Sequence, residues 1–281
     1  MNEVANKDFV HLKIHSQYSI CEGALRTSDL AKYCKENKIK AVGLCDSNNL
    51  CGALEFSESI AKSKTQPIIG TQIDIKYKNY FGKIPLFAKN LAGYKNLVKL
   101  STKSFLDIKI DDTPHCTIED LKKYSQGLIL LTGSFDGLVG KLFLKNLTDE
   151  ISLLFSELRS YFKDDLYIEI QRHADQGEKL FEKFLLNVSE KLEIPIIATH
   201  EVFYLDKSMH EAHDAYLCIG EKTYTNVKDR RKYTDQHYLK SSDEMYKLFK
   251  DLPDALENNL NFPFRISYRP KDSLPVLPNI Q

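Results

Sequence analysis

One early segment carries three polar side chains on alternate positions, and two of them are of a type that binds metal ions. His11, Lys13 and His15 alternate with apolar residues in the stretch Phe9–Ser19. Because successive side chains of a β-strand point to opposite faces, a strand here would carry all three on one face. Two histidines on one face of a strand can bind one ion, and neutral imidazole is a common zinc ligand. The alternative interpretation is an edge strand whose polar face is solvated.

Further polar residues follow other apolar segments that we expect to be strands. Strand ends of this kind meet at one end of an α/β barrel, where such barrels carry their sites. Lysine only donates hydrogen bonds, phenylalanine binds no cation, and serine and glutamine are weak zinc ligands. The set is therefore an incomplete ring of ligands. Its members are Lys13, His15, Asp46, Ser47, Gln72, Lys83, Ser134, His173, Glu201 and Phe203.

Apolar and amphipathic segments alternate about seven times along the chain. The apolar runs are short, as in buried strands, and helical periodicity lies between them. This alternation favours a parallel sheet or a closed α/β barrel. We predict a barrel, because the polar residues gather after the strands. The expected strands cover residues 9–14, 41–45, 67–75, 85–88, 128–132, 167–171 and 194–199.

The end of the sequence differs from the rest. Ser241 and Glu244 have the spacing of a capping box that starts a helix running to Phe249. Residues 262–281 contain four prolines and little periodicity, which predicts an extended linker. We therefore divide the chain into a domain of residues 1–261 and a linker of residues 262–281.

Composition disfavours several classes of protein. The 281 residues, 42% of them hydrophobic, are enough for one large domain. Lysine plus arginine equals aspartate plus glutamate at 39 each, which argues against a dedicated DNA-binding surface. The six cysteines form no C-x-x-C pair, the N-terminal residues are unlike a signal peptide, and no apolar run reaches about 18 residues. We expect a reduced, cytoplasmic protein that makes no membrane contact.

Motifs distributed along the chain resemble one family. The stretch F-V-H-L-K-I-H-S-Q-Y-S-I-C-E-G at residues 9–23 is similar to the opening of the polymerase and histidinol phosphatase (PHP) domain of bacterial DNA polymerase III alpha subunits. Further similar motifs follow in the family's order, so the resemblance covers nearly the whole chain. They include P-I-I-G at 67–70, E-I-Q-R-H at 169–173, A-T-H-E at 198–201, Y-L-K-S at 238–241 and L-P-V-L-P at 274–278.

The resemblance implies a distorted seven-stranded (β/α)7 barrel with a helical and extended tail. Active members of the family hold several metal ions there for phosphoester hydrolysis. Losing ligands removes both the ion and the water that the ion would activate, so we expect neither a bound metal nor a catalytic residue in this segment. Carried over residue by residue, the ligand positions are retained at His15, Asp46, His173 and Glu201 and replaced at Lys13, Ser47, Gln72, Lys83, Ser134 and Phe203.

We hypothesise that Lys13 replaces the lost metal charge. Its ammonium group would form an ion pair with Asp46 or Glu201 across the mouth of the barrel. Simpler roles stay open for the retained positions. Asp46 can cap the turn after its strand, His173 can be a hydrogen-bonded loop residue, and Glu201 can be solvated.

By resemblance, the parent polypeptide is a DNA-directed DNA polymerase that uses magnesium in a domain beyond Gln281. This segment would be a scaffold that braces the rest of the alpha chain, docks the proofreading exonuclease subunit and meets DNA only through the full-length enzyme. One alternative is an active metal-dependent phosphoesterase or 3'-5' exonuclease that uses zinc or manganese with a reduced ligand set. Another is a nucleic-acid-binding module, which the zero net charge disfavours.

Overall fold

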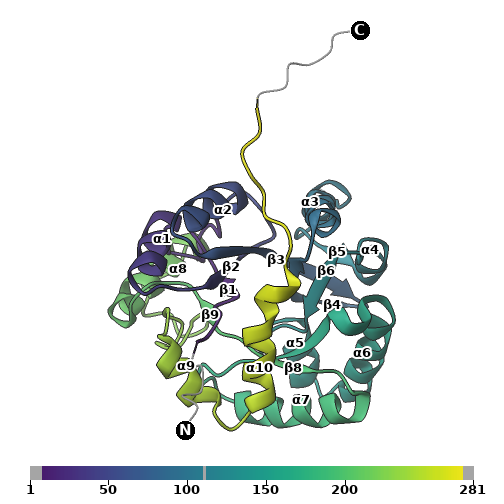
Figure 1. Ribbon diagram of the computed structural model, residues 1–281. Helices are drawn as coiled ribbons and strands as arrows, with labels where there is room; N and C mark the ends of the chain where they lie inside the picture. The colour runs from purple at the N-terminus through teal and green to yellow at the C-terminus, as the bar shows by residue number, and fades with distance from the viewer. Residues whose placement is uncertain (1–7, 110–111, 275–281) are drawn as a thin grey trace, which may run out of the picture.

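The computed structural model of the protein describes residues 8–109 and 112–274. Within these residues a central curved sheet is surrounded by helices (Figure 1). Residues 1–7 of the expected domain and residues 275–281 of the expected linker lie outside the described residues.

The strands of the described chain form one sheet in the order β8-β7-β6-β4-β3-β2-β1-β9, and β5 pairs with β3. The pairings are parallel except that β4 is antiparallel to both β3 and β6. The strands are β1 Lys13–Ile14, β2 Ala41–Ser47, β3 Gln66–Tyr77, β4 Tyr80–Ala88, β5 Cys116–Thr117, β6 Leu128–Leu131, β7 Leu166–Ile170, β8 Ile196–Ala198 and β9 Glu201–Val202.

The α-helices of the described chain are α1 Thr27–Glu36, α2 Ala53–Lys62, α3 Leu91–Leu106, α4 Ile118–Lys123, α5 Leu138–Leu144, α6 Thr148–Phe162, α7 Glu178–Leu192, α8 His210–Glu221, α9 Ser242–Phe249 and α10 Pro253–Asn261. Short 3-10 helices are η1 Lys163–Asp165, η2 Lys207–Met209 and η3 Phe262–Arg265. The predicted capping box is present, because Ser241 and Glu244 each accept a hydrogen bond from the other's backbone at the start of α9.

One segment of chain forms both edges of the sheet. β8 pairs with β7 and β9 pairs with β1, yet only Thr199 and His200 separate β8 from β9. The sheet therefore closes on itself as a distorted barrel. The predicted α/β barrel class is confirmed, and its seven expected strands correspond to β1, β2, β3, β4, β6, β7 and β8.

Two features depart from the predicted alternation of parallel strands and helices. β4 follows β3 after the two-residue turn Lys78–Asn79, and a connection this short can only join antiparallel strands. β5 and β9 have two residues each, too few to show any alternation in the sequence. The expected strand 9–14 is also shorter, because only Lys13–Ile14 keeps strand geometry.

Hydrophobic side chains from six of the strands meet in one cluster inside the barrel. Alternate residues of these strands point inward, as the period of a strand requires, while the others pack under the helices. Phe262 and Ile266, from the segment expected to be a linker, complete the cluster. The remaining members are Val10, Leu12, Ala41, Cys45, Ile68, Phe87, Ile129, Leu131, Tyr167 and Ile197.

The first part of the expected linker is packed on the barrel. Phe262 is fully buried, and its ring meets Phe87 edge to face with centroids 5.4 Å apart. Further along, the Ser267 amide donates to the Lys89 carbonyl at 2.8 Å, and Arg269 pairs with Glu58 at 2.7 Å. Burial of the Phe262 ring stabilises this part of the chain, so the segment packs on the barrel before it leaves the domain. No described helix is both long enough and apolar enough to cross a membrane.

Candidate functional site

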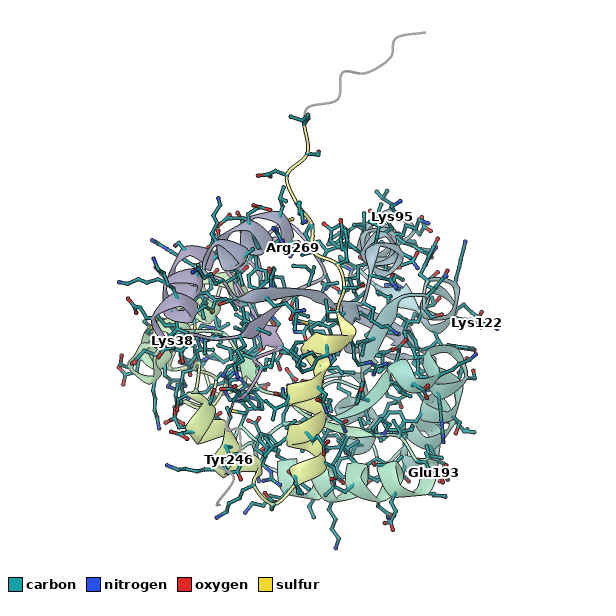
Figure 2. The ribbon with its side chains drawn as sticks, viewed as in Figure 1. Lys38, Lys95, Lys122, Glu193, Tyr246 and Arg269 are labelled. Carbon is teal, nitrogen blue, oxygen red and sulfur yellow. The ribbon has the colours of Figure 1, made fainter. Side chains whose placement is uncertain are left out.

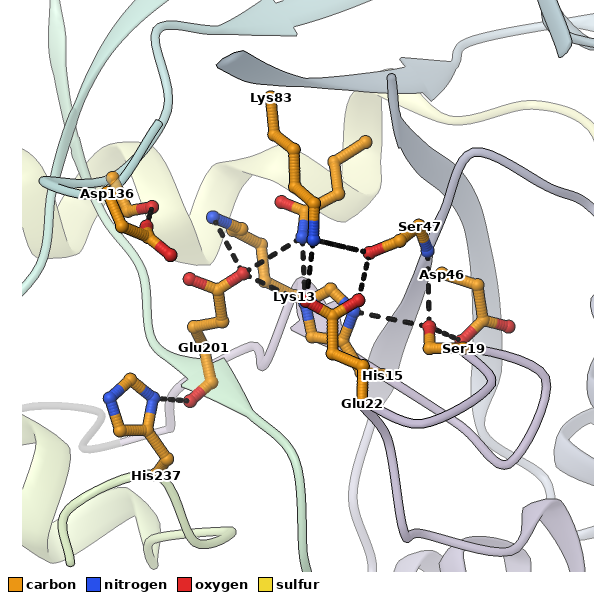
Figure 3. A network of polar contacts seen from close by, with 12 residues as sticks. Lys13, His15, Ser19, Glu22, Asp46, Ser47, Lys83, Asp136, Glu201 and His237 are labelled. Carbon is orange, nitrogen blue, oxygen red and sulfur yellow. Dashed lines mark hydrogen bonds and ion pairs between the residues drawn. The ribbon is translucent and has the colours of Figure 1, made fainter. Parts of the chain in front are cut away.

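The pairing of β1 with β9 places Lys13 beside Glu201 at the barrel mouth. Lys13 Nζ lies 3.5 Å from Glu201 Oε1 and 3.5 Å from Oε1 of Glu169 on β7. The side chains of Lys13 and Glu169 have 0% exposure, and that of Glu201 has 4%. One ammonium group is therefore buried between two carboxyl groups (Figure 3 shows the contact with Glu201).

Electrostatics keep this lysine charged. Burial lowers the pKa of Lys13, but Glu169 and Glu201 more than offset burial and raise that pKa above its usual range. Burial raises the pKa of Glu201, whereas Lys13 and then His15 bring it well below its ordinary value. For Glu169 burial outweighs Lys13, so the pKa of this carboxyl is raised. The ionised pair is thus Lys13 with Glu201, and Glu169 gives up its proton less readily.

Glu201 is the centre of the network that surrounds this pair (Figure 3). His15 Nε2 lies 2.9 Å from Glu201 Oε1, and the Gln72 amide donates to the same oxygen at 3.1 Å. The ring of Phe203 stacks on His15 with centroids 4.7 Å apart. Gln72 and Phe203 thus fill the expected ligand positions as a hydrogen-bond donor and a packing surface.

A second lysine is paired in the same way. Lys83 Nζ lies 2.5 Å from Glu22 Oε1 and 3.0 Å from Ser47 Oγ. Burial raises the pKa of Glu22, but Lys83 more than offsets burial and lowers it to about 2. Lys83 is on β4, whose antiparallel direction brings its first residues to the same end of the barrel as the ends of β2 and β3.

Asp46, the other expected partner of Lys13, is bound elsewhere. Its Oδ1 accepts hydrogen bonds from the Ser16 amide and from Ser19 Oγ, both at 2.7 Å. Its Oδ2 accepts from Ser16 Oγ at 2.8 Å. Burial raises the pKa of Asp46. This carboxyl holds the loop after β1 in place, as the simpler turn interpretation would have it, and Glu169 occupies the place beside Lys13.

A pocket of about 360 Å³ opens next to the network. Ser134, His173 and Glu201 line it, so the pocket brings three of the expected positions together. Ser134 donates to Asp136, and the backbone amide of His173 donates to Glu178 at 2.7 Å. Burial raises the pKa of Glu178 to about 7.

Among the described residues, His173, Asp175 and His237 bring possible metal-binding atoms within 4.8 Å of one another. His237 has the arrangement of a ligand, because its Nδ1 lies 3.2 Å from the Glu201 carbonyl and its buried Nε2 has no partner. His173 does not. Its Nε2 accepts a hydrogen bond from the Glu201 amide at 3.2 Å, so in the neutral ring Nδ1 carries the proton. The His173 and His237 rings are also stacked, 4.0 Å apart and 2° from parallel, whereas imidazole binds an ion in its ring plane. The three residues therefore fit a single metal ion poorly.

These rings belong to a column of buried imidazoles. His11 meets His200 at 5.9 Å, and His200 stacks on His173 at 4.6 Å. His11 Nε2 and His200 Nε2 face the carbonyls of Lys240 and Tyr238, at 2.8 Å and 3.0 Å. The column thus fixes the segment before α9 against the barrel.

Sequence reasoning missed several members of the site. Glu169 carried a signal, because a carboxyl within the otherwise apolar strand Y-I-E-I needs a buried partner. Glu22 lies within the opening motif at residues 9–23, and its neighbours in the sequence do not distinguish it from a surface carboxylate. Asp175 lies only two residues after the expected site residue His173, whereas His237 carried no local signal, since long-range folding alone brings it to the pocket.

The fold and the site define a class of domain, which is a closed α/β barrel with charged side chains at the carboxyl ends of its strands. The sequence identifies the family within this class. Residues 11–173 match the family model of the PHP domain, so the chain belongs to the PHP domain family.

The curated relatives that the chain resembles are DNA polymerase III alpha subunits. The chain is 38% identical over 273 residues to the DNA polymerase III subunit alpha of Rickettsia bellii, covering 97% of this chain and 23% of that protein. It is 35% identical over 287 residues to that of Caulobacter vibrioides, covering 99% of this chain and 25% of that protein. It thus spans about a quarter of the length of these relatives. A solved amidohydrolase from Chromobacterium violaceum is 10% identical with a TM-score of 0.44, covering 69% of this chain and 87% of that one, a likeness too weak to carry an inference.

Proposed function

We propose that the chain is the N-terminal PHP domain of a replicative DNA polymerase III alpha subunit and that it acts as a metal-free scaffold. The parent polypeptide would be the DNA-directed DNA polymerase, with its magnesium in a domain beyond Gln281. The scaffold would brace that polymerase body in the cytoplasm. DNA would be bound through the full-length enzyme.

The observation that carries the metal-free part of the proposal is the buried ammonium group of Lys13 between Glu169 and Glu201. A metal centre needs carboxylate and imidazole lone pairs that converge on empty space. Here a fixed positive charge fills that space and neutralises the carboxylates instead. Any cation brought to the same carboxylates would be repelled by an ammonium group at close range.

Lys83 supports the same conclusion within the same network (Figure 3). It pairs with Glu22 at 2.5 Å, so a second carboxylate also has its counter-charge from the protein. At the position expected for a closing ligand, Phe203 offers no lone pair and stacks on His15.

We also propose that the domain docks the proofreading exonuclease subunit. The relatives named DNA polymerase III subunit alpha and the resemblance of the motifs support this assignment. Mixing the purified chain with that exonuclease and measuring the mass of the complex by light scattering tests it. Separate elution at micromolar concentrations of both would contradict it.

The metal content of the purified, tag-free chain tests the scaffold. After dialysis without chelator we expect less than about a tenth of an ion per chain, because zinc in a complete site survives such handling. The matched control is the double variant Lys13→His, Lys83→His, which removes both ammonium groups and restores ligand side chains. A gain of metal in that variant would show that the lysines are what excludes the ion. About one zinc or manganese ion in the wild-type chain would contradict the proposal.

A second candidate function is a working phosphoesterase or 3'-5' exonuclease with a reduced ligand set. The group of His173, Asp175 and His237 is the observation that favours it. It predicts cleavage of single-stranded DNA with manganese or zinc present and loss of cleavage in His237→Asn. No cleavage by the wild-type chain above the His237→Asn background would eliminate it.

A further inference from the structure

Helix α3 carries an apolar stripe on its outer face. Leu91, Val98 and Phe105 recur every seven residues, so they lie along one side of the helix. Their exposed fractions are 47%, 41% and 51%. The opposite side of α3 is already used, because Leu97 and Leu100 are fully buried in the core.

The described domain leaves about half of each of these three side chains uncovered. Single exposed apolar residues are ordinary, but a row of them along one helix is typical of a contact surface. A narrow seam with a seven-residue repeat is the pattern by which one helix packs against another helix or a groove. The side chains are therefore suited to burial against something outside residues 8–109 and 112–274.

The last described residues leave the domain alongside this helix. Tyr268 contacts Tyr94 of α3 with ring centroids 5.4 Å apart. In Figure 1 the chain then runs outward between α2 and α3, and Figure 2 shows Arg269 and Lys95 at that same end of the molecule. The described chain therefore passes beside α3 before it ends at Leu274.

The charge of α3 indicates what kind of surface would cover it. Its residues include Lys95, Lys99 and Lys103 and neither aspartate nor glutamate. Lys103 is paired with Asp107 and Asp120, whereas Lys95 is exposed beside the stripe. An apolar surface with acidic residues at its edge is the complementary partner.

We propose that the α3 stripe docks the polypeptide that follows residue 274, through an apolar surface bordered by acidic side chains. The relatives are about four times as long as this chain, which supplies a segment of sufficient size. This inference rests on the proposed function, in which a polymerase body follows the domain. It assigns the contact between the two to one helix.

Hydroxyl-radical footprinting of the full-length polypeptide and of the 281-residue chain tests the contact. We expect oxidation of Phe105 to be at least fivefold slower in the full-length protein. The double variant Val98→Lys, Phe105→Lys should lower the midpoint of thermal unfolding of the full-length protein and leave that of the 281-residue chain within experimental error. Its matched control is Leu180→Lys, on α7 at the far end of the molecule in Figure 1, where Leu180 is 69% exposed. The control should change neither midpoint.

Equal oxidation of Phe105 in both proteins, or equal effects of the α3 variant and the Leu180 control, would overturn the inference. Slow oxidation in the 281-residue chain that vanishes on dilution would also overturn it, because a second copy would then cover the stripe. Neither result depends on metal content or nuclease activity. A failure of this inference is therefore distinguishable from a failure of the proposed function.

Discussion

A buried ammonium group is stable only where opposite charge compensates the loss of water, and Lys13 meets that condition through Glu201. Glu169 and Glu201 each come within 3.5 Å of its Nζ. Removing the lysine would leave both carboxyl groups, which are at most 4% exposed, without its positive charge. The stability of both buried carboxyl groups therefore depends on one side chain.

We expect Lys13→Met to lower the free energy of unfolding by roughly 3–5 kcal/mol, as when one partner of a buried ion pair is lost. Urea denaturation at pH 7 measures it. Lys95→Met is the matched control, because that lysine is exposed and its loss should cost less than about 0.5 kcal/mol. Equal stabilities of the Lys13 variant and the wild type would show that the pair is unimportant.

The imidazole column predicts loss of stability in mild acid. Burial lowers the pKa of His11 to about 4, below the value of roughly 6.5 expected in the unfolded chain. The unfolded state then binds a proton that the folded state excludes, so stability falls as pH drops from about 6.5 to about 4. His200 and His173 shift in the same direction through burial. Glu178, with its pKa raised to about 7, opposes them.

The contribution of His11 to this loss of stability is tested by comparing unfolding free energies at pH 7.5 and pH 4.5. In His11→Gln the difference between the two pH values should shrink by on the order of 2–3 kcal/mol, because the excluded proton is gone. The difference itself, rather than the stability at either pH, is the readout, since the substitution also removes a hydrogen bond. An unchanged difference would mean that His11 is already protonated in the folded state.

The sequence placed Lys13 and Glu201 at one end of a barrel because both follow from the strand pattern. It could not choose between Asp46 and Glu201 as the partner, since that choice depends on the register of β1 with β9. Nor could it tell that the serines of the loop after β1 would occupy Asp46. Loop hydrogen bonds form only once the strands have fixed the positions of the loop ends.

At the scale of elements, the β3–β4 hairpin explains why one expected strand runs against its neighbours. Its turn is Lys78–Asn79, and Lys78 takes a positive φ of 54° without being glycine. Hairpins of this length are recognised in sequences mainly by Asn-Gly or Asp-Gly, so the turn gave little signal. Lys83 reaches the site only because of this reversal.

The end of the chain offers a matched pair for an element-scale prediction. Phe262 is fully buried in the barrel interior, whereas Phe264 in the same 3-10 helix is 87% exposed. We expect Phe262→Ala to cost about 3–5 kcal/mol of unfolding free energy and Phe264→Ala less than about 0.5 kcal/mol. Urea denaturation of both variants measures the difference. Similar small losses would mean that η3 is dispensable and that the domain ends before it.

The proline-rich composition of residues 262–281 predicts an extended linker. Composition alone does not distinguish the buried ring of Phe262 from the exposed ring of Phe264. Only the folded barrel shows that Phe262 is packed in its interior. The capping box of Ser241 and Glu244 was predictable because all of its contacts are local.

For the molecule as a whole, equal numbers of acidic and basic residues predict weak contact with DNA. We expect the isolated chain to bind duplex DNA with a Kd weaker than about 10⁻⁴ M at physiological salt, at or beyond the weak end of non-specific binding. Fluorescence anisotropy with a labelled duplex measures it. Micromolar binding that falls steeply with added salt would instead favour the nucleic-acid-binding alternative.

The barrel as a whole was predictable because its strands and helices alternate, and such alternation has few compact solutions. What was not predictable is how the ring closes. No pattern in residues 194–202 indicates that the first half pairs with one neighbour and the second half with another.

That closure sets the order in which a growing chain can finish folding. β1 is synthesised before the other strands of the sheet, yet its second neighbour, β9, comes nearly 190 residues later. Until Glu201 has left the ribosome, Lys13 lacks its ion-pair partner from β9. Both edge strands of the sheet also remain unpaired and accessible to other nascent chains. Contacts between residues this distant in sequence form slowly. The partly folded chain is therefore exposed to aggregation during this interval, which chaperones would limit.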